Sequence, residues 1–331
     1  MESITIIGAG GWGTALAVTL SQNGRPIKLW AFEREVVQSI QDRRENAIFL
    51  PGAKVPESVR PTGDLGEALD GARIVLTVMP SHVCRALYEQ MLPHLSPAMI
   101  FVSATKGIDE RLMRMSEVIC STVGRRFEPR LCALSGPSFA KEVARGDPTA
   151  VVIASESPEA AAFIQREFSS PTFRLYASTD VIGVELGGAV KNVIAIAAGV
   201  IEGLGLGHNP TAALITRGLA EMTRLACACG ARRETMAGLA GIGDLTLTCT
   251  GAQSRNRTVG VELGKGRGLE EIISSMRTVA EGVKTTRSTV ALAARHGVEV
   301  PITCQVDRIL EGAVSPRAAI RELMERTLKQ E

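Results

Sequence analysis

The chain has 331 residues, 45% of them hydrophobic and 22% charged, which exceeds the usual size of one domain and excludes a disordered protein. Its net charge of +2 and aromatic content of 4% argue against nucleic-acid binding, which needs a cationic surface and base-stacking side chains. The seven cysteines are odd in number and scattered, as expected of reduced thiols in a cytoplasmic protein. We predict no secretory signal, no membrane insertion and no metal site.

The first half of the chain alternates short apolar runs with amphipathic stretches. Nearly continuous apolar runs indicate parallel strands that helices cover on both faces. Six strands are predicted: Ile4–Ile7, Ile27–Trp30, Ile74–Val78, Met99–Val102, Leu131–Leu134 and Ala150–Ala154. Five helices are predicted between them: Gly11–Asn23, Val36–Arg44, Val83–Leu92, Leu112–Val123 and Glu159–Phe168. This alternation predicts an α/β domain with a doubly wound parallel sheet.

A glycine-rich turn follows the first strand and opens the first helix. Its glycines are Gly8, Gly10, Gly11 and Gly13, with Trp12 among them. In a dinucleotide-binding turn the first glycine makes the tight turn, the second lets a pyrophosphate approach, and the last lets helix and strand pack closely. The strand before it and the helix after it are the context that this motif requires. We therefore predict a Rossmann domain that binds NAD or NADP.

Further polar residues follow later strands. Lys106 follows the run Met99–Val102, and Gly136 and Ser138 follow the run Leu131–Leu134. Ligands of an open parallel sheet bind outside the carboxyl ends of its strands, so these residues should border the cofactor crevice. Lys106 would then face an anionic substrate. Alternatively, Lys106 is an ordinary surface lysine, and Gly136 and Ser138 only make a turn.

Helical patterns dominate from Val181 onward, and Asp180 and its neighbours supply an N-cap for the first of these helices. A second helix is predicted with Asn209 as N-cap, Pro210 at the first helical position and Gly230 past its end. We expect a dinucleotide-binding Rossmann domain over residues 1–180 and a helical substrate-binding and catalytic domain over residues 181–331.

Lys191 is embedded in small and apolar residues of the helix that begins near Val181. Helical spacing puts Glu185, Gly188 and Asn192 on one stripe, with Lys191 at its edge. One interpretation is helix packing through small residues, with the lysine reaching solvent. The other is a desolvated lysine that faces a ligand, with its pKa lowered toward that of a usable acid and base. In that case Asn192 would lie beside the substrate.

Two later motifs complete the set of candidate residues. Asp244 follows a Gly-Ile-Gly sequence and could be only a helix N-cap. Arg255 and Asn256, which follow Ser254, offer planar recognition of a phosphate through several hydrogen-bond donors.

Taken in order, the segments 8–13, 103–107, 135–140, 183–192, 241–245 and 254–257 closely resemble bacterial NAD(P)-dependent glycerol-3-phosphate dehydrogenases over nearly the whole chain. The resemblance implies a Rossmann domain followed by an all-helical domain, and reversible reduction of dihydroxyacetone phosphate to sn-glycerol 3-phosphate, the backbone of glycerophospholipids. It also suggests a homodimer.

The resemblance implies Lys191 as the proton donor and acceptor, with Lys106 lowering its pKa by like-charge repulsion and Asp244 orienting both. The implied substrate contacts are Lys106, Gly136, Ser138, Asp244, Ser254, Arg255 and Asn256. The implied cofactor contacts are Gly11, Trp12, Phe32, Lys106, Ala140, Arg255, Val279 and Glu281.

The end of the second strand departs from the family pattern. Many members carry His or Arg where this chain has Phe32, and Glu33 follows it. A carboxylate there can accept hydrogen bonds from the ribose hydroxyls of NAD but repels the 2′-phosphate of NADP, so NAD is favoured. Arg34 opposes this preference for NAD, because its side chain could swing over the same ribose while Glu33 turns to solvent. Two alternatives stay open: a dehydrogenase of another small hydroxy acid, and a dinucleotide-sensing regulator without turnover.

Overall fold

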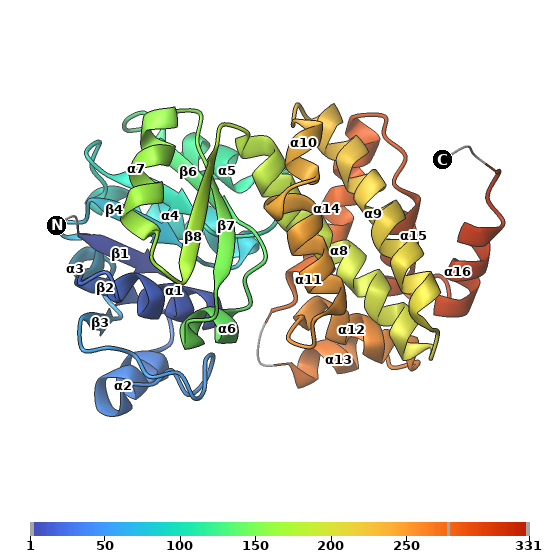
Figure 1. The fold of residues 1–331 in the computed structure, drawn as a ribbon, viewed down its shortest axis with the longest axis horizontal. Helices are drawn as coiled ribbons and strands as arrows, with labels where there is room; N and C mark the ends of the chain where they lie inside the picture. Colours follow the sequence, from blue (N-terminus) through green and yellow to red (C-terminus); the bar gives the residue numbers. More distant parts are fainter. Residues whose placement is uncertain (1–2, 277–278, 329–331) are drawn as a thin grey trace.

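The computed structural model describes residues 3–276 and 279–328. Figure 1 shows a sheet with helices at one end of the molecule and a purely helical assembly at the other. The fold is a mixed α/β N-terminal domain followed by an all-helical domain, as the sequence predicts. The last strand ends at Ser178, and the first helix of the helical domain begins at Val181.

The sheet has eight strands in the order β3-β2-β1-β4-β5-β6-β7-β8. Their bounds are β1 Ile4–Ile7, β2 Ile27–Trp30, β3 Val59–Thr62, β4 Ile74–Thr77, β5 Ile100–Ser103, β6 Arg130–Ser135, β7 Thr149–Ala154 and β8 Phe173–Ser178. All six predicted strands are present within a few residues of their expected bounds. Because β1 lies between β2 and β4, third in this order, the turn after it opens at an interior strand and not at an edge strand of the sheet.

Two features of the sheet differ from the prediction. The edge strands β3 and β8 were not predicted: β3 contains Pro61 and Arg60, and β8 alternates polar with apolar residues instead of forming a continuous apolar run. The prediction of a wholly parallel sheet was also wrong, because β7 pairs antiparallel with β6. Apolar content indicates that a strand is buried on both faces, but it does not report strand direction.

Helices cover both faces of the sheet, which confirms the doubly wound arrangement. One core packs the sheet against α1, α2, α6 and α7, and the other packs it against α3, α4 and α5. The bounds are α1 Gly11–Ser21, α2 Arg34–Arg43, α3 Leu65–Leu69, α4 Cys84–Met91, α5 Met115–Val123, α6 Ala140–Arg145 and α7 Pro158–Phe168. The short helices α3 and α6 were not predicted, since five or six residues carry little periodicity.

The helical domain is built around α8, which runs through its middle (Figure 1). The bounds are α8 Val181–Gly203, α9 His208–Ala228, α10 Arg233–Met236, α11 Asp244–Thr250, α12 Arg255–Gly264, α13 Leu269–Ser275, α14 Glu281–Arg295, α15 Pro301–Leu310 and α16 Pro316–Met324. By length and hydropathy α8 could span a membrane, but 83% of its most apolar window is buried inside the protein. It is therefore a core helix.

The caps of α8 and α9 test the predicted helix boundaries. The Asp180 carboxylate accepts a hydrogen bond from the Gly183 amide at 2.9 Å, which confirms the N-cap of α8. The start of α9 was misplaced: its N-cap is Gly207 rather than Asn209, so Pro210 is the third helical residue. Proline is tolerated there because the first-turn amides have no partner inside the helix. Gly230 follows the end of α9 with a φ of 98°, as predicted.

Candidate active site

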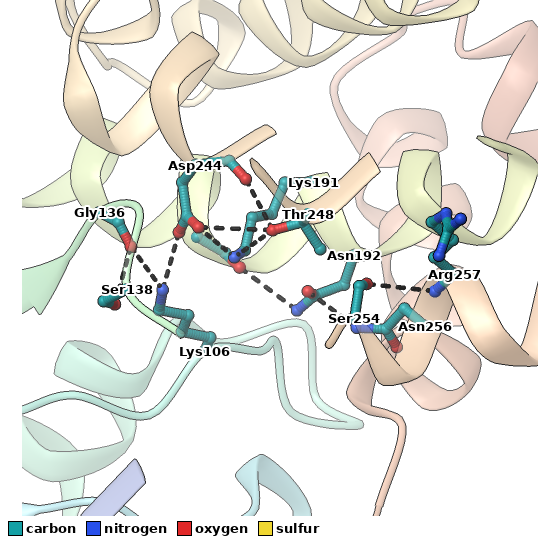
Figure 2. A network of polar contacts seen from close by, with 11 residues as sticks. Lys106, Gly136, Ser138, Lys191, Asn192, Asp244, Thr248, Ser254, Asn256 and Arg257 are labelled. Atoms are coloured by element: carbon teal, nitrogen blue, oxygen red, sulfur yellow. Dashed lines mark hydrogen bonds and ion pairs between the residues drawn. The ribbon is translucent and has the colours of Figure 1, made fainter. Parts of the chain in front are cut away.

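Two lysines from different domains converge on one carboxylate, as Figure 2 shows. Lys106, in the connection after β5, donates to Asp244 Oδ2 at 2.7 Å and to the Gly136 carbonyl at 3.1 Å. Lys191, on α8, donates to Asp244 Oδ1. Asp244 is 1% exposed and is the first residue of α11, so it is not the N-cap that the alternative interpretation suggested. The structure thus brings Lys106, Gly136, Lys191 and Asp244 together.

Lys191 does not reach solvent, since only 6% of it is exposed. Burial lowers its pKa to about 7, against the opposing effect of the Asp244 charge, and the Lys106 charge lowers it further. The interpretation in which Lys191 reaches solvent is therefore wrong, and the lysine is desolvated. A lysine with this pKa can hold or release a proton near neutral pH.

Thr248 is a polar contact of Lys191 that the sequence analysis missed. Its hydroxyl accepts a hydrogen bond from Lys191 Nζ at 2.8 Å and donates to the Asp244 carbonyl at 2.6 Å. Because its single proton is committed to that carbonyl, the hydroxyl can only accept from the lysine. Thr248 lies four residues after Asp244 on one helix, so helical spacing could have placed both on the same face.

A second group of polar residues lies at the start of α12. Ser254 is its N-cap, and the Ser254 hydroxyl accepts a hydrogen bond from the Arg257 amide at 3.2 Å. Arg255 is the first residue of the helix and is exposed. A helix N-terminus with unpaired amides, a hydroxyl and a guanidinium suits an anion such as a phosphate.

The amides of Asn192 and Asn256 form a chain between α8 and α12 (Figure 2). Asn256 Nδ2 donates to Asn192 Oδ1 at 3.0 Å, and Asn192 Nδ2 donates to the Gly188 carbonyl at 3.3 Å. Asn256 Oδ1 accepts from the Gly282 amide at 2.9 Å, at the start of α14. Both side chains are therefore largely occupied in holding three helices together. Each amide nitrogen keeps one N–H that could reach a ligand.

The glycine turn has the geometry that its predicted role demands. Gly8 has a φ of 115°, and a side chain there would collide with the Val78 carbonyl oxygen. A Cβ atom at Gly13 would collide with the Gly8 carbonyl, so that glycine allows the close packing of helix on strand. The space beside Gly10, the N-cap of α1, is open. The turn therefore fits a pyrophosphate against the N-terminus of α1.

The remaining predicted cofactor contacts near this turn differ in how exposed their side chains are. Phe32 is 81% exposed and lies two residues past the end of β2, and Glu33 and Arg34 are the N-cap and first residue of α2. Trp12 packs partly buried against the sheet core. Ala140 begins α6, close to Gly11 of α1. The exposed ring of Phe32 offers a flat apolar surface next to the turn.

Val279 and Glu281 lie where the helical domain approaches the sheet domain. Val279 is exposed, and Glu281 is the first residue of α14. Ser81, which follows β4, donates to the Glu281 carboxylate through its hydroxyl at 2.6 Å and its amide at 3.3 Å. Desolvation lowers the pKa of Arg255, and the negative charge of Glu281 opposes that shift. These contacts tie the start of α14 to the carboxyl end of β4.

Within residues 3–276 and 279–328, no group of three or more His, Cys, Asp or Glu side chains is placed to hold a metal ion. The polar groups around Asp244 are two ammonium groups, one carboxylate that they share, and the Thr248 hydroxyl, which accepts from Lys191.

Comparisons with known proteins agree over the whole chain. Residues 3–161 match the family described as NAD-dependent glycerol-3-phosphate dehydrogenase N-terminus, and residues 180–321 match its C-terminus. A glycerol-3-phosphate dehydrogenase [NAD(P)+] from Koribacter versatilis (strain Ellin345) is 62% identical over 98% of each chain, and one from Acidobacterium capsulatum is 54% identical over both full lengths. The crystal structure of glycerol-3-phosphate dehydrogenase from Coxiella burnetii superimposes with a TM-score of 0.94, at 41% identity, covering 98% of this chain and 99% of that one.

Proposed function

This chain belongs to the NAD-dependent glycerol-3-phosphate dehydrogenase family, and we propose that Lys191 is the acid and base of its reaction. The enzyme reduces dihydroxyacetone phosphate reversibly to glycerol 3-phosphate with NAD(P)H, a step in phospholipid biosynthesis. This membership decides against a dehydrogenase of another small hydroxy acid and against a regulator without turnover. The burial of Lys191 against Asp244 is the observation that carries the proposal.

The proton that reduction requires is held at Lys191 Nζ. When bound, the nicotinamide supplies the hydride to the ketone carbon of dihydroxyacetone phosphate. Lys191 protonates the oxygen on which negative charge develops, and in the reverse direction it takes the proton from the alcohol. Its pKa of about 7 leaves both protonation states accessible near neutral pH. Asp244 and Thr248 hold the ammonium group in place.

Lys106 would contribute in two ways. Its positive charge helps to lower the pKa of Lys191, and it remains tethered to the Gly136 carbonyl on the sheet side. The Ser138 hydroxyl donates to the same carbonyl at 3.0 Å, so both donors lie at one edge of the site. We place the carbonyl oxygen and the free hydroxyl of the substrate between these groups and Lys191.

We place the substrate phosphate at the N-terminus of α12, with Ser254, Arg255 and Asn256 as its ligands. The first-turn amides and the guanidinium supply the charge-assisted donors that a phosphate needs. Asn192 supports this site by accepting a hydrogen bond from Asn256. The asparagines would therefore orient the phosphate site more than they would carry its charge.

The cofactor would bind across the glycine turn, with its pyrophosphate over Gly8, Gly10, Gly11, Trp12 and Gly13. We place the adenosine end beside Phe32, Glu33 and Arg34, and the nicotinamide end toward Lys106, Ala140, Arg255, Val279 and Glu281. Glu33 at the end of β2 favours NAD over NADP, because its carboxylate would repel a 2′-phosphate.

The division near residue 180, the cytoplasmic location and the homodimer belong to the same proposal. The gap between β8 and α8, from Ser178 to Val181, supports the division. The net charge of +2 and the buried α8 agree with a cytoplasmic enzyme without membrane insertion and without a nucleic-acid partner. Light scattering of the purified protein tests the dimer.

The role of Lys191 is tested by Lys191→Ala, with Lys265→Ala as the control because Lys265 is exposed and pairs at the surface with Glu262. We expect Lys191→Ala to lower kcat by about 10² to 10⁴, the usual contribution of a positioned general acid, with NADH affinity nearly unchanged. Lys265→Ala should keep the parent rate. Normal turnover in folded Lys191→Ala would remove Lys191 from the mechanism.

A further inference from the structure

Glu185 is a buried carboxylate on α8 that the reaction does not use. It lies less than two turns before Lys191 on α8. Its hydrogen bonds, however, go to α5 and not to the Asp244 cluster, which consists of Lys106, Lys191, Asp244 and Thr248. Its oxygens accept hydrogen bonds from the Ser116 amide at 2.7 Å, the Ser116 hydroxyl at 2.5 Å and Arg114 Nη1 at 2.8 Å. These partners form the start of α5, so Glu185 joins the catalytic helix of one domain to a helix of the other.

The Glu185 carboxylate is buried, and burial disfavours its charged form. Burial raises the pKa of Glu185, and the charge of Arg114 together with the Ser116 donors opposes that shift. The N-terminal end of α5 adds a favourable dipole. A buried ion pair stabilises a fold poorly compared with apolar packing. Its hydrogen bonds, however, form only when the carboxylate and its donors are correctly oriented. The contact is therefore better suited to setting the position of α8 than to holding the domains together.

The connection from β5 to α5 touches α8 at two places. At its start, the Lys106 stem lies beside Gly188 of α8, where a side chain would collide with the Ser135 hydroxyl. At its end, Arg114 donates to Glu185, and Ser116 in the first turn of α5 does the same. Lys106 and Glu185 also line one small cavity, together with Ser103 and Ser135. The position of Lys106 along α8 and the Glu185 contact are thus parts of one arrangement.

We propose that Glu185 is a positioning residue, whose carboxylate holds α8 in register with the β5–α5 connection and so sets how Lys191 and Lys106 meet on Asp244. Residues 185 and 191 are six positions apart on a continuous helix, about 9 Å along its axis. A shift at one end of this rigid segment moves the other. The inference rests on the proposed role of Lys191.

Glu221 provides a matched control. It is also a buried carboxylate whose pKa burial raises, and it also accepts from a helix N-terminus, through the Ile302 amide, the Thr303 amide and the Thr303 hydroxyl at 2.9, 2.9 and 2.6 Å. Its partners begin α15, inside the helical domain. Glu185→Gln and Glu221→Gln thus remove the same group from similar surroundings, but only the first lies between the domains.

The experiment measures kcat, KM for dihydroxyacetone phosphate, NADH Kd and melting temperature for Glu185→Gln and Glu221→Gln. Both should melt at lower temperature than the parent. We expect Glu185→Gln to lower kcat about tenfold per folded molecule, with NADH Kd within twofold of the parent, and Glu221→Gln to keep kcat within twofold. Equal kcat values in the two variants would overturn the proposal.

A milder pair covers the case in which Glu185→Gln does not fold. Ser116→Ala removes one donor to Glu185, and Thr303→Val removes the matching donor to Glu221. We expect a threefold to fivefold lower kcat for Ser116→Ala and an unchanged kcat for Thr303→Val. An unchanged kcat in Ser116→Ala would refute the positioning role. The proposed function is tested separately by Lys191→Ala. An inactive Lys191→Ala with a fully active Glu185→Gln would reject this inference alone.

Discussion

The cofactor edge of the sheet and the Asp244 cluster are built in opposite ways. The cofactor edge that we propose would use the backbone of consecutive residues in the glycine turn and exposed side chains such as Phe32. The cluster uses buried charges, and its two lysine–Asp244 hydrogen bonds join residues 53 and 138 positions apart. Water and salt screen charges at an exposed edge, whereas buried charges interact strongly. Substitutions in the cluster should therefore have the larger effects.

Asp244→Asn tests the buried side most severely. It removes the negative charge that Lys106 and Lys191 share and leaves two ammonium groups close together. We expect kcat/KM to fall by about 10³, equivalent to about 4 kcal/mol of transition-state stabilisation. The free energy of unfolding should fall by about 3 kcal/mol, as when one member of a buried ion pair is lost. Steady-state kinetics and urea denaturation measure both.

An Asp244→Asn variant with parent-like kcat/KM would show that the shared carboxylate is dispensable, and it would remove the contrast between the two regions. Asp147→Asn is a suitable control, since Asp147 also pairs with a basic residue, Arg145, but at the surface. Its kcat and stability should stay close to those of the parent, because exposed ion pairs contribute about 0 to 1 kcal/mol.

Arg255→Ala should raise KM for dihydroxyacetone phosphate about 10-fold to 100-fold, since a charge-assisted contact worth roughly 1.5 to 3 kcal/mol is lost. Discrimination against unphosphorylated dihydroxyacetone should shrink in parallel. Arg257→Ala is the matched control, because Arg257 lies on the same helix and pairs with Glu202. If Arg255→Ala keeps the parent's ratio of kcat/KM for the two substrates, the phosphate binds elsewhere.

Thr248→Val keeps the shape of the side chain but removes the oxygen that accepts from Lys191. We expect kcat to fall about tenfold, because one hydrogen bond to a charged group is lost while Asp244 still holds the lysine. Thr246→Val, two residues earlier on α11, serves as the control. Stopped-flow or steady-state assays at saturating substrate give kcat directly, and an unaltered value would mean that the Asp244 carboxylate positions Lys191 alone.

Glu33→Ser probes the exposed cofactor edge, where the smallest effect is expected. The parent should favour NADH over NADPH in kcat/KM by roughly tenfold, and the variant should reduce this preference about fivefold, since one screened charge is worth about 1 kcal/mol. Glu35→Ser, in the first turn of α2, is the control. A parent that prefers NADPH, or a ratio unchanged by Glu33→Ser, would show that Glu33 does not contact the ribose.

The same contrast explains how much could be predicted from the sequence. The glycine turn was predictable because its strand, its glycines and its helix are adjacent in the chain. Lys191 was flagged by its small neighbours, but its burial and its pairing with Asp244 depend on how α8 and α11 pack. Thr248 lacked a motif of its own. The pairing of Glu185 with Ser116 could not be predicted, because it depends on the packing of two domains.

The pH dependence of kcat in both directions tests the central claim most directly. Lys191 has a pKa of about 7, so it is protonated below that pH and neutral above it. Reduction of dihydroxyacetone phosphate needs the protonated form, and its kcat should fall as the pH rises through about 7. Oxidation of glycerol 3-phosphate needs the neutral form, and its kcat should rise over the same interval. Rates that change in the same direction, or that respond only near the ordinary lysine pKa of about 10.4, would contradict the assignment of Lys191 as the acid and base.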